Sequence, residues 1–374
     1  MTVTRHVSAN VPDAGPGSIR PLAREDIPEL VALRRQAFRR SERGGPDDLA
    51  AYFERIFFQS PFRDPDIHSL VYEDERGRVG GFVGAVPRRM LFRGEPIRVV
   101  IETQMMVALR CGGRVGRRLL SQLLAGPQDL TLTDDANNAS RRLWESVGGE
   151  RSAIHGLRWV RPLRLIGHTA RRFTRSALGR GVVTAARPLI AAADALLARL
   201  PGPSRQAPPP GSIEPLDARG IVTHLEEVAG SRSLRPAYDE ASLQWLLAQL
   251  VEKERLGTPR QALVRDQAGD VAGWFVYYVN PVATSEVLQV AARPAAEKVV
   301  LRCLFWDAWR HGASAVAGRV EPWLVEALGG TNWAILRWVH QWTLVHSRRL
   351  EILHAIEQGD ALLSLLDGEW WLGF

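Results

Sequence analysis

Hydrophobic and polar positions over residues 18–165 predict an ordered series of strands and helices. Apolar residues three and four positions apart indicate helices, and short runs of Val, Phe, Met and Ile between polar turns indicate strands. The expected elements are, in order, a strand at 18–22, helices from Arg24 to Phe38 and over 47–59, an antiparallel meander over 68–109, a helix from Gly116, a strand at 130–133, a helix from Asn137 to Val147, and a strand over 153–163. This order predicts an α/β fold: a mixed, mostly antiparallel sheet with helices on both faces.

The second half of the chain echoes the first. The segment SIRPL at Ser18 resembles SIEPL at Ser212, and VGGFV at Val79 resembles VAGWF at Val271. Both echoes are displaced by roughly 190 residues and keep the same order, which indicates a duplicated domain. We therefore expect two tandem domains of the same fold class.

The predicted organisation has four parts: a flexible N-terminus at 1–17, a first domain at 18–165, a basic helical connector with a proline-rich linker at 166–211, and a second domain at 212–374. A transmembrane span within 166–200 is not expected, because Arg187, Pro188 and Asp194 interrupt its apolar segment. Two interpretations of this segment stay open. It forms an amphipathic helix that packs on a domain, or it makes weak contact with an anionic membrane surface.

Composition places the chain among soluble globular proteins, with 45% hydrophobic and 24% charged residues. The formal net charge is +7, but no basic and aromatic motif accompanies it, so the sequence carries no strong nucleic-acid signal. The two cysteines predict no disulfide framework, and the histidines lack metal-ligand spacing, so we expect no metal. The first residues lack the apolar core of a signal peptide, which favours a cytoplasmic location.

The stretch ALRCGGRVGRRLLSQLLAG at 108–126 places glycines and arginines directly before an apolar run with helical spacing. Backbone N–H groups at the positive end of a helix hold anions, so the stretch favours a phosphate site. An ordinary strand-to-helix turn in an arginine-rich chain explains it equally well.

With this turn between the fourth strand and the next helix, the element order resembles the GNAT acetyltransferase superfamily. The resemblance covers the first domain well and returns more faintly over 212–374. It implies that the turn is an acyl-CoA pyrophosphate loop and that acetyl-CoA is the acyl donor. Cys111 stands where the family has Arg or Gln, Arg114 stands in place of a glycine, and Gly116 keeps the family residue. The implied cofactor-binding residues of the loop are Cys111, Gly112, Gly113, Arg114, Val115, Gly116 and Arg117.

A second motif, from Asn137 to Gly149, is similar to the family's Asn-x-x-Ala-x-x-Leu-Tyr-x-x-x-Gly-Phe. The resemblance implies that Asn137 contacts the pantetheine arm. Trp144 replaces the tyrosine that protonates the departing thiolate, and an indole has no proton to give at neutral pH. The alternative is a helix capped by Asn137 and Gly148.

The resemblance also implies where the chemistry takes place. A backbone N–H of the fourth strand, at Met106 or Val107, polarises the thioester carbonyl. A carboxylate early on that strand removes the amine proton, and Glu102 stands there, although a solvent-facing strand residue explains it as well. Ser140 is a candidate acid for the thiolate but a poor one, given the pKa of an alcohol. Cys111 is interpreted as a small loop residue, because no histidine near it in sequence would activate a thiol nucleophile.

The second domain is expected to hold no CoA. Its counterpart of the turn, Arg293 to Leu301, contains no glycine. Pro294 lacks an N–H donor, Ala295 carries a Cβ atom, and Glu297 puts a negative charge where a pyrophosphate would lie. We therefore predict one CoA per chain, with the second domain packed against the first.

Together these observations predict an N-acyltransferase that moves an acetyl group from acetyl-CoA to an amine on a small molecule or peptide. Two alternatives stay open: a transferase that uses aminoacyl-tRNA or an acyl carrier protein, and a non-catalytic GNAT scaffold that binds acyl-CoA or a partner protein. The acceptor is expected to contact residues around 38–66 and 150–165, but no pattern there identifies it. The sequence does not predict the oligomeric state.

Overall fold

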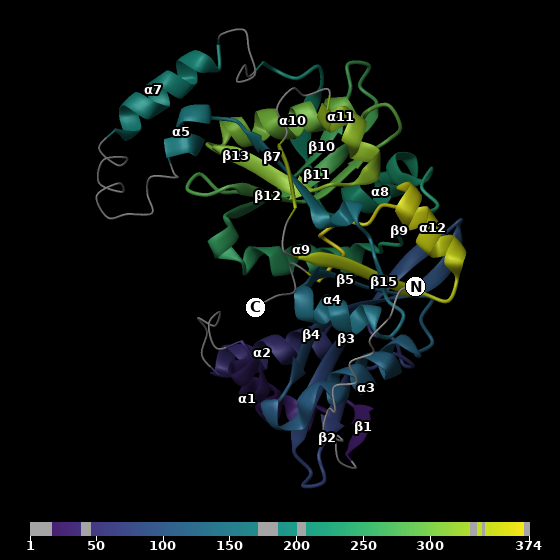
Figure 1. Cartoon of the computed structure of the whole chain (residues 1–374). Coiled ribbons are helices and arrows are strands. Elements are labelled where there is room, and N and C mark those ends of the chain that lie inside the picture. The colour runs from purple at the N-terminus through teal and green to yellow at the C-terminus, as the bar shows by residue number, and fades with distance from the viewer. Residues whose placement is uncertain are drawn as a thin grey trace, which may run out of the picture.

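The computed structural model of the chain describes residues 17–38, 46–170, 186–199, 207–329, 335–338 and 341–369. Within these ranges the chain forms two mixed sheets, of eight and seven strands, with helices packed on their faces (Figure 1). The predicted α/β class is therefore confirmed. The predicted flexible N-terminus, apart from Gly17, lies outside the described residues.

The elements of the first half follow its sequence pattern closely. They are β1 (Ser18–Pro21), α1 (Ile27–Ala37), α2 (Pro46–Phe57), β2 (Leu70–Glu73), β3 (Val79–Phe92), β4 (Glu95–Val107), α3 (Gly112–Leu124), β5 (Leu130–Ala136), α4 (Asn138–Glu145), β6 (Glu150–Arg151) and β7 (Leu157–Pro162). Helix α3 begins at Gly112 rather than at the predicted Gly116, so the glycines of the turn belong to the first turn of the helix itself.

The second half repeats this series. Its elements are β8 (Ser212–Pro215), α8 (Ala218–Ala229), β9 (Leu234–Pro236), α9 (Glu240–Val251), β10 (Thr258–Arg265), β11 (Val271–Val279), β12 (Ser285–Ala292), α10 (Glu297–Arg310), β13 (Ala315–Arg319), α11 (Val325–Gly329), β14 (Ile335–Trp338), β15 (Trp342–Ser347) and α12 (Leu350–Gln358). Strand β8 has the length and the exposure pattern of β1, as the echo of SIRPL in SIEPL predicts.

Strand order agrees with a duplication. The first sheet runs β1-β2-β3-β4-β5-β15-β6, with β9 added beside the end of β3, and the second runs β8-β10-β11-β12-β13-β7-β14. In each sheet one inner pair is parallel, β4 with β5 and β12 with β13, and the other pairs are antiparallel. The two sheets are therefore built on one plan.

The two halves also exchange a strand. Strand β7 from the first half pairs with β13 and β14 in the second sheet, and β15 from the second half pairs with β5 and β6 in the first (Figure 1). Both exchanged strands are internal, so removing either would leave backbone N–H and C=O groups of two neighbours unpaired. The predicted boundaries at 165 and 212 divide the chain by sequence position, but each sheet contains strands from both halves.

Two helices of the connector contact each other at the edge of the molecule, α5 (Leu165–Ala170) and α7 (Arg187–Leu197) (Figure 1). Asp194 of α7 accepts hydrogen bonds from the backbone N–H groups of Ile166 and Gly167, both at 2.9 Å, and so caps the start of α5. Residues 171–185 and 200–206 of the predicted connector lie outside the described part. Throughout the described ranges, every helix is too short or too polar to cross a bilayer.

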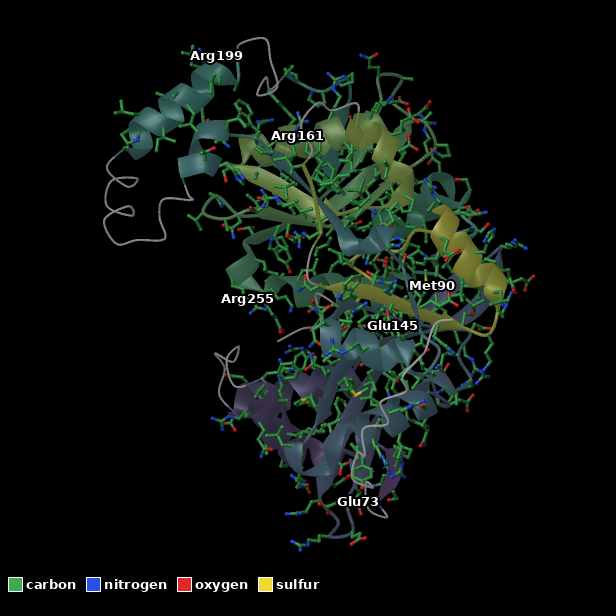
Figure 2. The ribbon with its side chains drawn as sticks, in the orientation of Figure 1. Glu73, Met90, Glu145, Arg161, Arg199 and Arg255 are labelled. Atoms are coloured by element: carbon green, nitrogen blue, oxygen red, sulfur yellow. The ribbon has the colours of Figure 1, made fainter. Side chains whose placement is uncertain are left out.

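Side chains of both halves fill the layer between the sheets (Figure 2). One hydrophobic cluster combines Phe53 and Phe82 from the first half with Leu246 and Trp274 from the second. Met90, near the end of β3, lies in this layer and is paired with Pro236 of β9. The shared core and the exchanged strands indicate that the halves fold as one unit.

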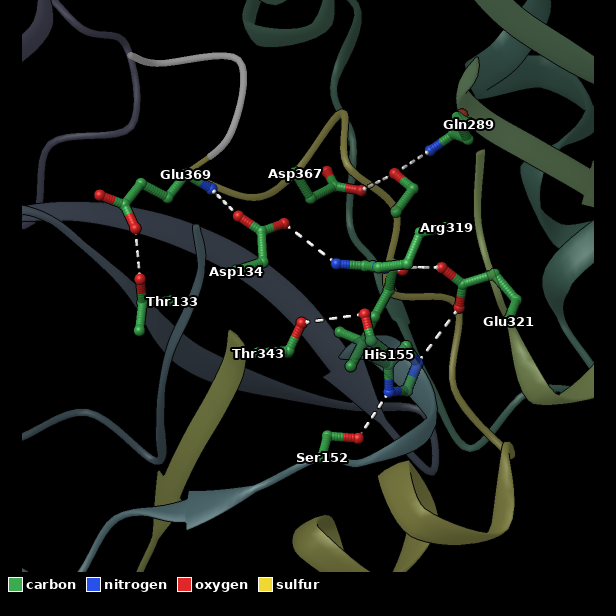
Figure 3. Close-up of polar contacts among 12 residues, drawn as sticks. Thr133, Asp134, Ser152, His155, Gln289, Arg319, Glu321, Thr343, Asp367 and Glu369 are labelled. Atoms are coloured by element: carbon green, nitrogen blue, oxygen red, sulfur yellow. Dashed lines mark hydrogen bonds and ion pairs between the residues drawn. The ribbon is translucent and has the colours of Figure 1, made fainter. Parts of the chain in front are cut away.

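A buried group of charges joins the two sheets (Figure 3). Arg319, the last residue of β13, donates hydrogen bonds to Asp134 of β5 at 3.0 Å and to Glu321 at 3.1 Å. The same guanidinium donates to the backbone carbonyl of Leu363. His155 lies 3.3 Å from the other oxygen of Glu321. Arg319 therefore holds β5 of the first sheet against the end of β13 of the second.

Candidate active site

The first sheet opens between its two parallel strands. Strands β4 and β5 pair only over Val99–Ile101 and Leu130–Leu132, and their pairing then ends. Just beyond this point Gln104 has a φ of 57°, and two residues of β4 oppose one residue of β3, which forms a β-bulge. The bulge redirects the end of β4. The region between the ends of β4 and β5, beyond their last paired residues, is called the opening.

Past the bulge, the backbone of β4 directs a donor into this opening. The N–H of Ala108 donates to the carbonyl of Gly80 on β3 at 2.9 Å. Because residues of an antiparallel strand face their partner alternately, Met106 faces β3 as Ala108 does, and the N–H of Val107 points toward β5. Of the two predicted donors to a thioester carbonyl, the geometry favours Val107.

The predicted pyrophosphate loop presents open backbone at the start of α3. Gly112 has a φ of 68°, which glycine adopts without strain. A Cβ added to Gly112 or Gly113 would meet no described atom within 4 Å. Both glycines and Arg114 are exposed, while Val115 is buried in the core beneath them. The N–H groups at this end of α3 are therefore accessible to an anion.

Two further residues of the loop are engaged with the protein. Gly116 is buried, and a Cβ added there would lie 3.4 Å from Val107 and 3.5 Å from Leu143. Only a small side chain therefore fits at Gly116. Arg117 donates to the carbonyl of Ser146 at 3.1 Å, which holds α3 against the end of α4.

Cys111 lies against β3, where a Cβ added to Gly80 would come within 2.5 Å of its sulfur. Burial raises the pKa of the Cys111 thiol, which favours the protonated form. A thiolate nucleophile needs the opposite shift. The geometry therefore agrees with Cys111 as a small packing residue.

Asn137 caps helix α4. Its side-chain oxygen accepts hydrogen bonds from the N–H groups of Ala139 at 2.8 Å and Ser140 at 3.0 Å. The capping interpretation is therefore confirmed for Asn137, whereas the C-cap of the helix is Ser146 and not the expected Gly148. The cap uses the amide oxygen only, so contact of the exposed amide with a pantetheine arm stays a prediction. Ser140 lies half-buried in the first turn of α4.

Glu102 is buried at the inner end of the opening, with 3% of its surface exposed, so the alternative of a solvent-facing residue is wrong. The indole N–H of Trp144 donates to its carboxylate at 3.3 Å. Burial raises the pKa of Glu102 to about 7, although hydrogen bonds from Trp144 and Thr133 lower it. A carboxylate that titrates near neutral pH is suited to accept a proton from an amine.

Trp144 thus has a role that the sequence did not indicate. We expect Trp144→Phe to raise the pKa of Glu102, because phenylalanine keeps an aromatic ring but loses the donor that favours the carboxylate. In an acyl-transfer assay the acidic limb of the pH–rate profile should move to higher pH, with little change in turnover well above it. A limb that stays at its wild-type position would show that this hydrogen bond does not act on Glu102.

A second carboxylate in the opening comes from the far end of the chain. The carboxylate of Glu369 accepts a hydrogen bond from the N–H of Gln104 at 3.4 Å. It also accepts one from the hydroxyl of Thr133 (Figure 3). The N–H of Glu369 donates to Asp134 at 2.7 Å. No sequence motif pointed to Glu369, because it lies more than two hundred positions from both strands that it contacts.

A groove between the two halves ends close to this opening. Its main cavity, of about 710 Å³, is lined in part by Phe62 and Tyr238. A narrower cavity shares these two side chains and continues inward to Asp367 and Gly368. The groove therefore leads to the residue that precedes Glu369.

The walls of the groove match the predicted acceptor contacts only in part. Arg63 and Asp64 line both this groove and a neighbouring cavity of about 360 Å³, and both residues belong to the predicted region 38–66. Among the described residues, none from 150–165 lines either cavity. Contact of the acceptor with residues 150–165 therefore stays a prediction, and of the strands in this range β6 lies in the first sheet and β7 in the second.

The second sheet repeats the plan with different chemical groups: its buried carboxylate, Glu286 of β12, is paired with Arg158 of β7. Strand β12 of the second sheet corresponds to β4 of the first. When the two strands are aligned by their pairs with the preceding strand, Val287 occupies the position of Glu102. Before α10, Ala295 has a φ of 68°, the same value as Gly112. Ala295 therefore adopts the left-handed conformation in spite of its Cβ, at a cost of about 1–2 kcal/mol. Within the part of the chain seen here, no group of three or more His, Cys, Asp or Glu could hold a metal ion.

Comparison with known proteins finds a likeness in structure. No family model and no curated protein matches the sequence. A GCN5-related N-acetyltransferase from Anabaena variabilis ATCC 29413 has a TM-score of 0.55 at 11% identity, over 89% of this chain and 73% of that one. Another from Kribbella flavida has a TM-score of 0.53 at 13% identity, over 88% and 72%. A conserved protein from Enterococcus faecalis V583, described as a probable N-acyltransferase, has a TM-score of 0.55 at 11% identity, over 91% and 73%.

Proposed function

We propose that this chain, which has the fold of the GCN5-related N-acetyltransferases, transfers an acyl group from acyl-CoA to an amine. The donor in this proposal is acetyl-CoA, and the acceptor is a small molecule or peptide with a free amine. The chemistry belongs to the first sheet, and the second sheet supports it.

One observation carries the proposal. Glu102 is buried on β4, the N–H of Val107 on the same strand points toward β5, and the start of α3, the helix that follows this strand, is open. For a thioester bound in the opening, β4 would supply both the N–H donor to the carbonyl oxygen and the carboxylate that accepts the proton. The anionic end of the same donor would lie at the positive end of a helix.

These groups account for the first part of the reaction. The amine nitrogen attacks the thioester carbonyl carbon, and Glu102 accepts the proton that the nitrogen loses. The N–H of Val107 stabilises the negative charge that develops on the carbonyl oxygen. Because Glu102 must be ionised to act as a base, turnover should rise as the pH increases through about 7.

The test is release of free thiol from acetyl-CoA in the presence of an amine library. We expect release that depends on the amine, together with an amide product identified by its mass. Binding of acetyl-CoA without such release would replace the proposed enzyme with a scaffold that binds acyl-CoA. A chain that neither binds acetyl-CoA nor releases thiol would overturn the proposal altogether.

A further inference from the structure

Acyl transfer needs an acid for the departing thiolate, and the groups described so far supply none. The family's tyrosine is replaced by Trp144, whose N–H is engaged with Glu102. Ser140 is half-buried on α4 and is a weak acid. An indole does not release a proton near neutral pH. The acid must therefore come from another part of the chain.

Glu369 lies where such an acid is needed. It is held between the ends of β4 and β5 by the N–H of Gln104 and by the hydroxyl of Thr133 (Figure 3). Gln104 and Val107 are three residues apart on one strand, a separation of roughly 10 Å that a bulge shortens. A thioester whose carbonyl is bound at Val107 would therefore share the opening with this carboxyl group. Glu369 is only half-buried, so a ligand can reach it.

We propose that Glu369 is the general acid that protonates the departing thiolate, and that the hydroxyl of Thr133 links it to Glu102. This inference rests on the proposed acyl transfer. Thr133 is the position of β5 beside Glu102 of β4, one residue past the last paired residues of the two strands. A hydroxyl has one proton and two acceptor sites, so Thr133 can donate to one carboxylate and accept from the other when that one is protonated.

The surroundings of the two carboxyl groups separate their proton affinities. Burial raises the pKa of Glu369 well above its usual range, and the negative charge of Glu102 raises it further, while the bond from Thr133 lowers it. Glu102 itself titrates at about 7. The other titratable groups that act on Glu369 are Asp134 and Asp135 on β5 and Tyr52 on α2. At neutral pH and somewhat above, Glu369 therefore keeps its proton while Glu102 loses its own, which is how a pair divides the roles of acid and base.

The proposed cycle returns both groups to their starting states. The amine nitrogen forms a bond to the carbonyl carbon, and its proton passes to the carboxylate of Glu102. The bond from carbon to sulfur breaks, and the sulfur takes the electron pair and the proton of Glu369. The proton on Glu102 then moves through the hydroxyl of Thr133 to the carboxylate of Glu369. The products are one amide and one free thiol, and no oxidant or other reactant is needed.

The second half holds this acid in place. Asp367, two residues before Glu369, accepts hydrogen bonds from the hydroxyls of Tyr238 at 2.6 Å and Ser364 at 2.7 Å. Gln289 of β12 donates to Ser364 at 2.9 Å. The second half, which has no glycine turn of its own, therefore completes the site in the first sheet.

The experiment compares Glu369→Gln with wild type on two thioesters that lack the nucleotide. S-acetyl-N-acetylcysteamine releases an alkyl thiol of high pKa, and phenyl thioacetate releases an aryl thiol of low pKa that needs no acid. We expect the variant to lose roughly 10²-fold or more in kcat with the alkyl thioester, and much less with the aryl thioester. The alkaline limb of its pH–rate profile should also disappear, because that limb reports loss of the proton from Glu369.

Three controls separate the inference from the proposed function and from misfolding. Glu102→Gln should lose the same factor on both thioesters, because the base is needed with either leaving group. Glu357→Gln, on the exposed face of α12, should behave as wild type. Thr133→Val should slow the alkyl thioester more than the aryl one. Equal losses on both thioesters for Glu369→Gln, with the alkaline limb retained, would overturn the role of Glu369, whereas a wild type without amine-dependent transfer would overturn the proposed function.

Discussion

Glu102→Gln should lower kcat for acyl transfer roughly 10²–10⁴-fold and leave acetyl-CoA binding close to that of wild type. The amide of glutamine keeps the shape of the side chain and its bond from Trp144, but it cannot take a proton from the amine. The pH–rate profile should lose its acidic limb, since no carboxylate remains to titrate at about 7. Turnover and the pH profile, measured together, check this result.

Glu95→Gln is the matched control, because Glu95 is exposed at the start of the same strand. A second measurement concerns stability. The folded-state pKa of Glu102 lies above its unfolded value, so the folded protein binds the extra proton and its stability falls as the pH rises from about 4 to about 7. Glu102→Gln should therefore unfold at a higher temperature than wild type at pH 8. An unchanged profile with unchanged turnover would show that Glu102 is not the base.

Arg319→Met is expected to lower the free energy of unfolding by about 3–5 kcal/mol, because it leaves two buried carboxylates without their common partner. Arg319 contacts Asp134 at 3.0 Å and Glu321 at 3.1 Å, and all three side chains are buried. Methionine keeps most of the volume, so the loss reports the charge rather than a cavity. Urea unfolding, followed by circular dichroism and by tryptophan fluorescence, measures it.

Arg302→Ala, on the exposed side of α10, should change stability by less than about 0.5 kcal/mol and is the control. Both probes should report one shared transition for Arg319→Met, because β7 and β15 tie each sheet to the other half. A loss below 1 kcal/mol, or two separate transitions, would contradict the account of the interface.

The local elements could be predicted from the sequence because their signals are local. Patterns among neighbouring residues are enough to predict the periodic apolar positions of α1 and α3 and the polar turns between β2, β3 and β4. The echo of Ser18 in Ser212 likewise revealed the duplication, since it compares sequence with sequence. The start of α3 was predicted too late because the first glycines of the loop were interpreted as a turn before the helix, whereas the helix begins at Gly112.

The strand exchange could not be predicted in the same way. Strands β7 and β15 occupy equivalent positions in the two sheets, so local pattern does not decide which sheet each joins. The same limit applies to the site. Glu102 and the loop were found through a motif on nearby residues, but the bond from Trp144 and the approach of Glu369 depend on packing between distant segments. The position of Glu369 beside β4 and β5 is therefore visible only in the fold.

Acyl-CoA is proposed to bind to the first half alone, and a variant at the start of α3 tests this directly. Gly116 is buried between Val107 and Leu143, so a charged side chain there would also disturb the packing of α3. Gly113 is exposed and has open space around it, so Gly113→Glu adds a negative charge beside the bound anion and leaves the fold intact. The repulsion at contact distance is on the order of 1–4 kcal/mol, which corresponds to at least a fivefold loss of affinity.

Calorimetric titration of the full chain with acetyl-CoA is the measurement. We predict one site per chain in wild type, a clear loss of affinity in Gly113→Glu, and wild-type binding in Glu297→Ala, which alters the matching turn of the second half. Two sites per chain, or a single site that keeps its affinity in Gly113→Glu and loses it in Glu297→Ala, would contradict the account.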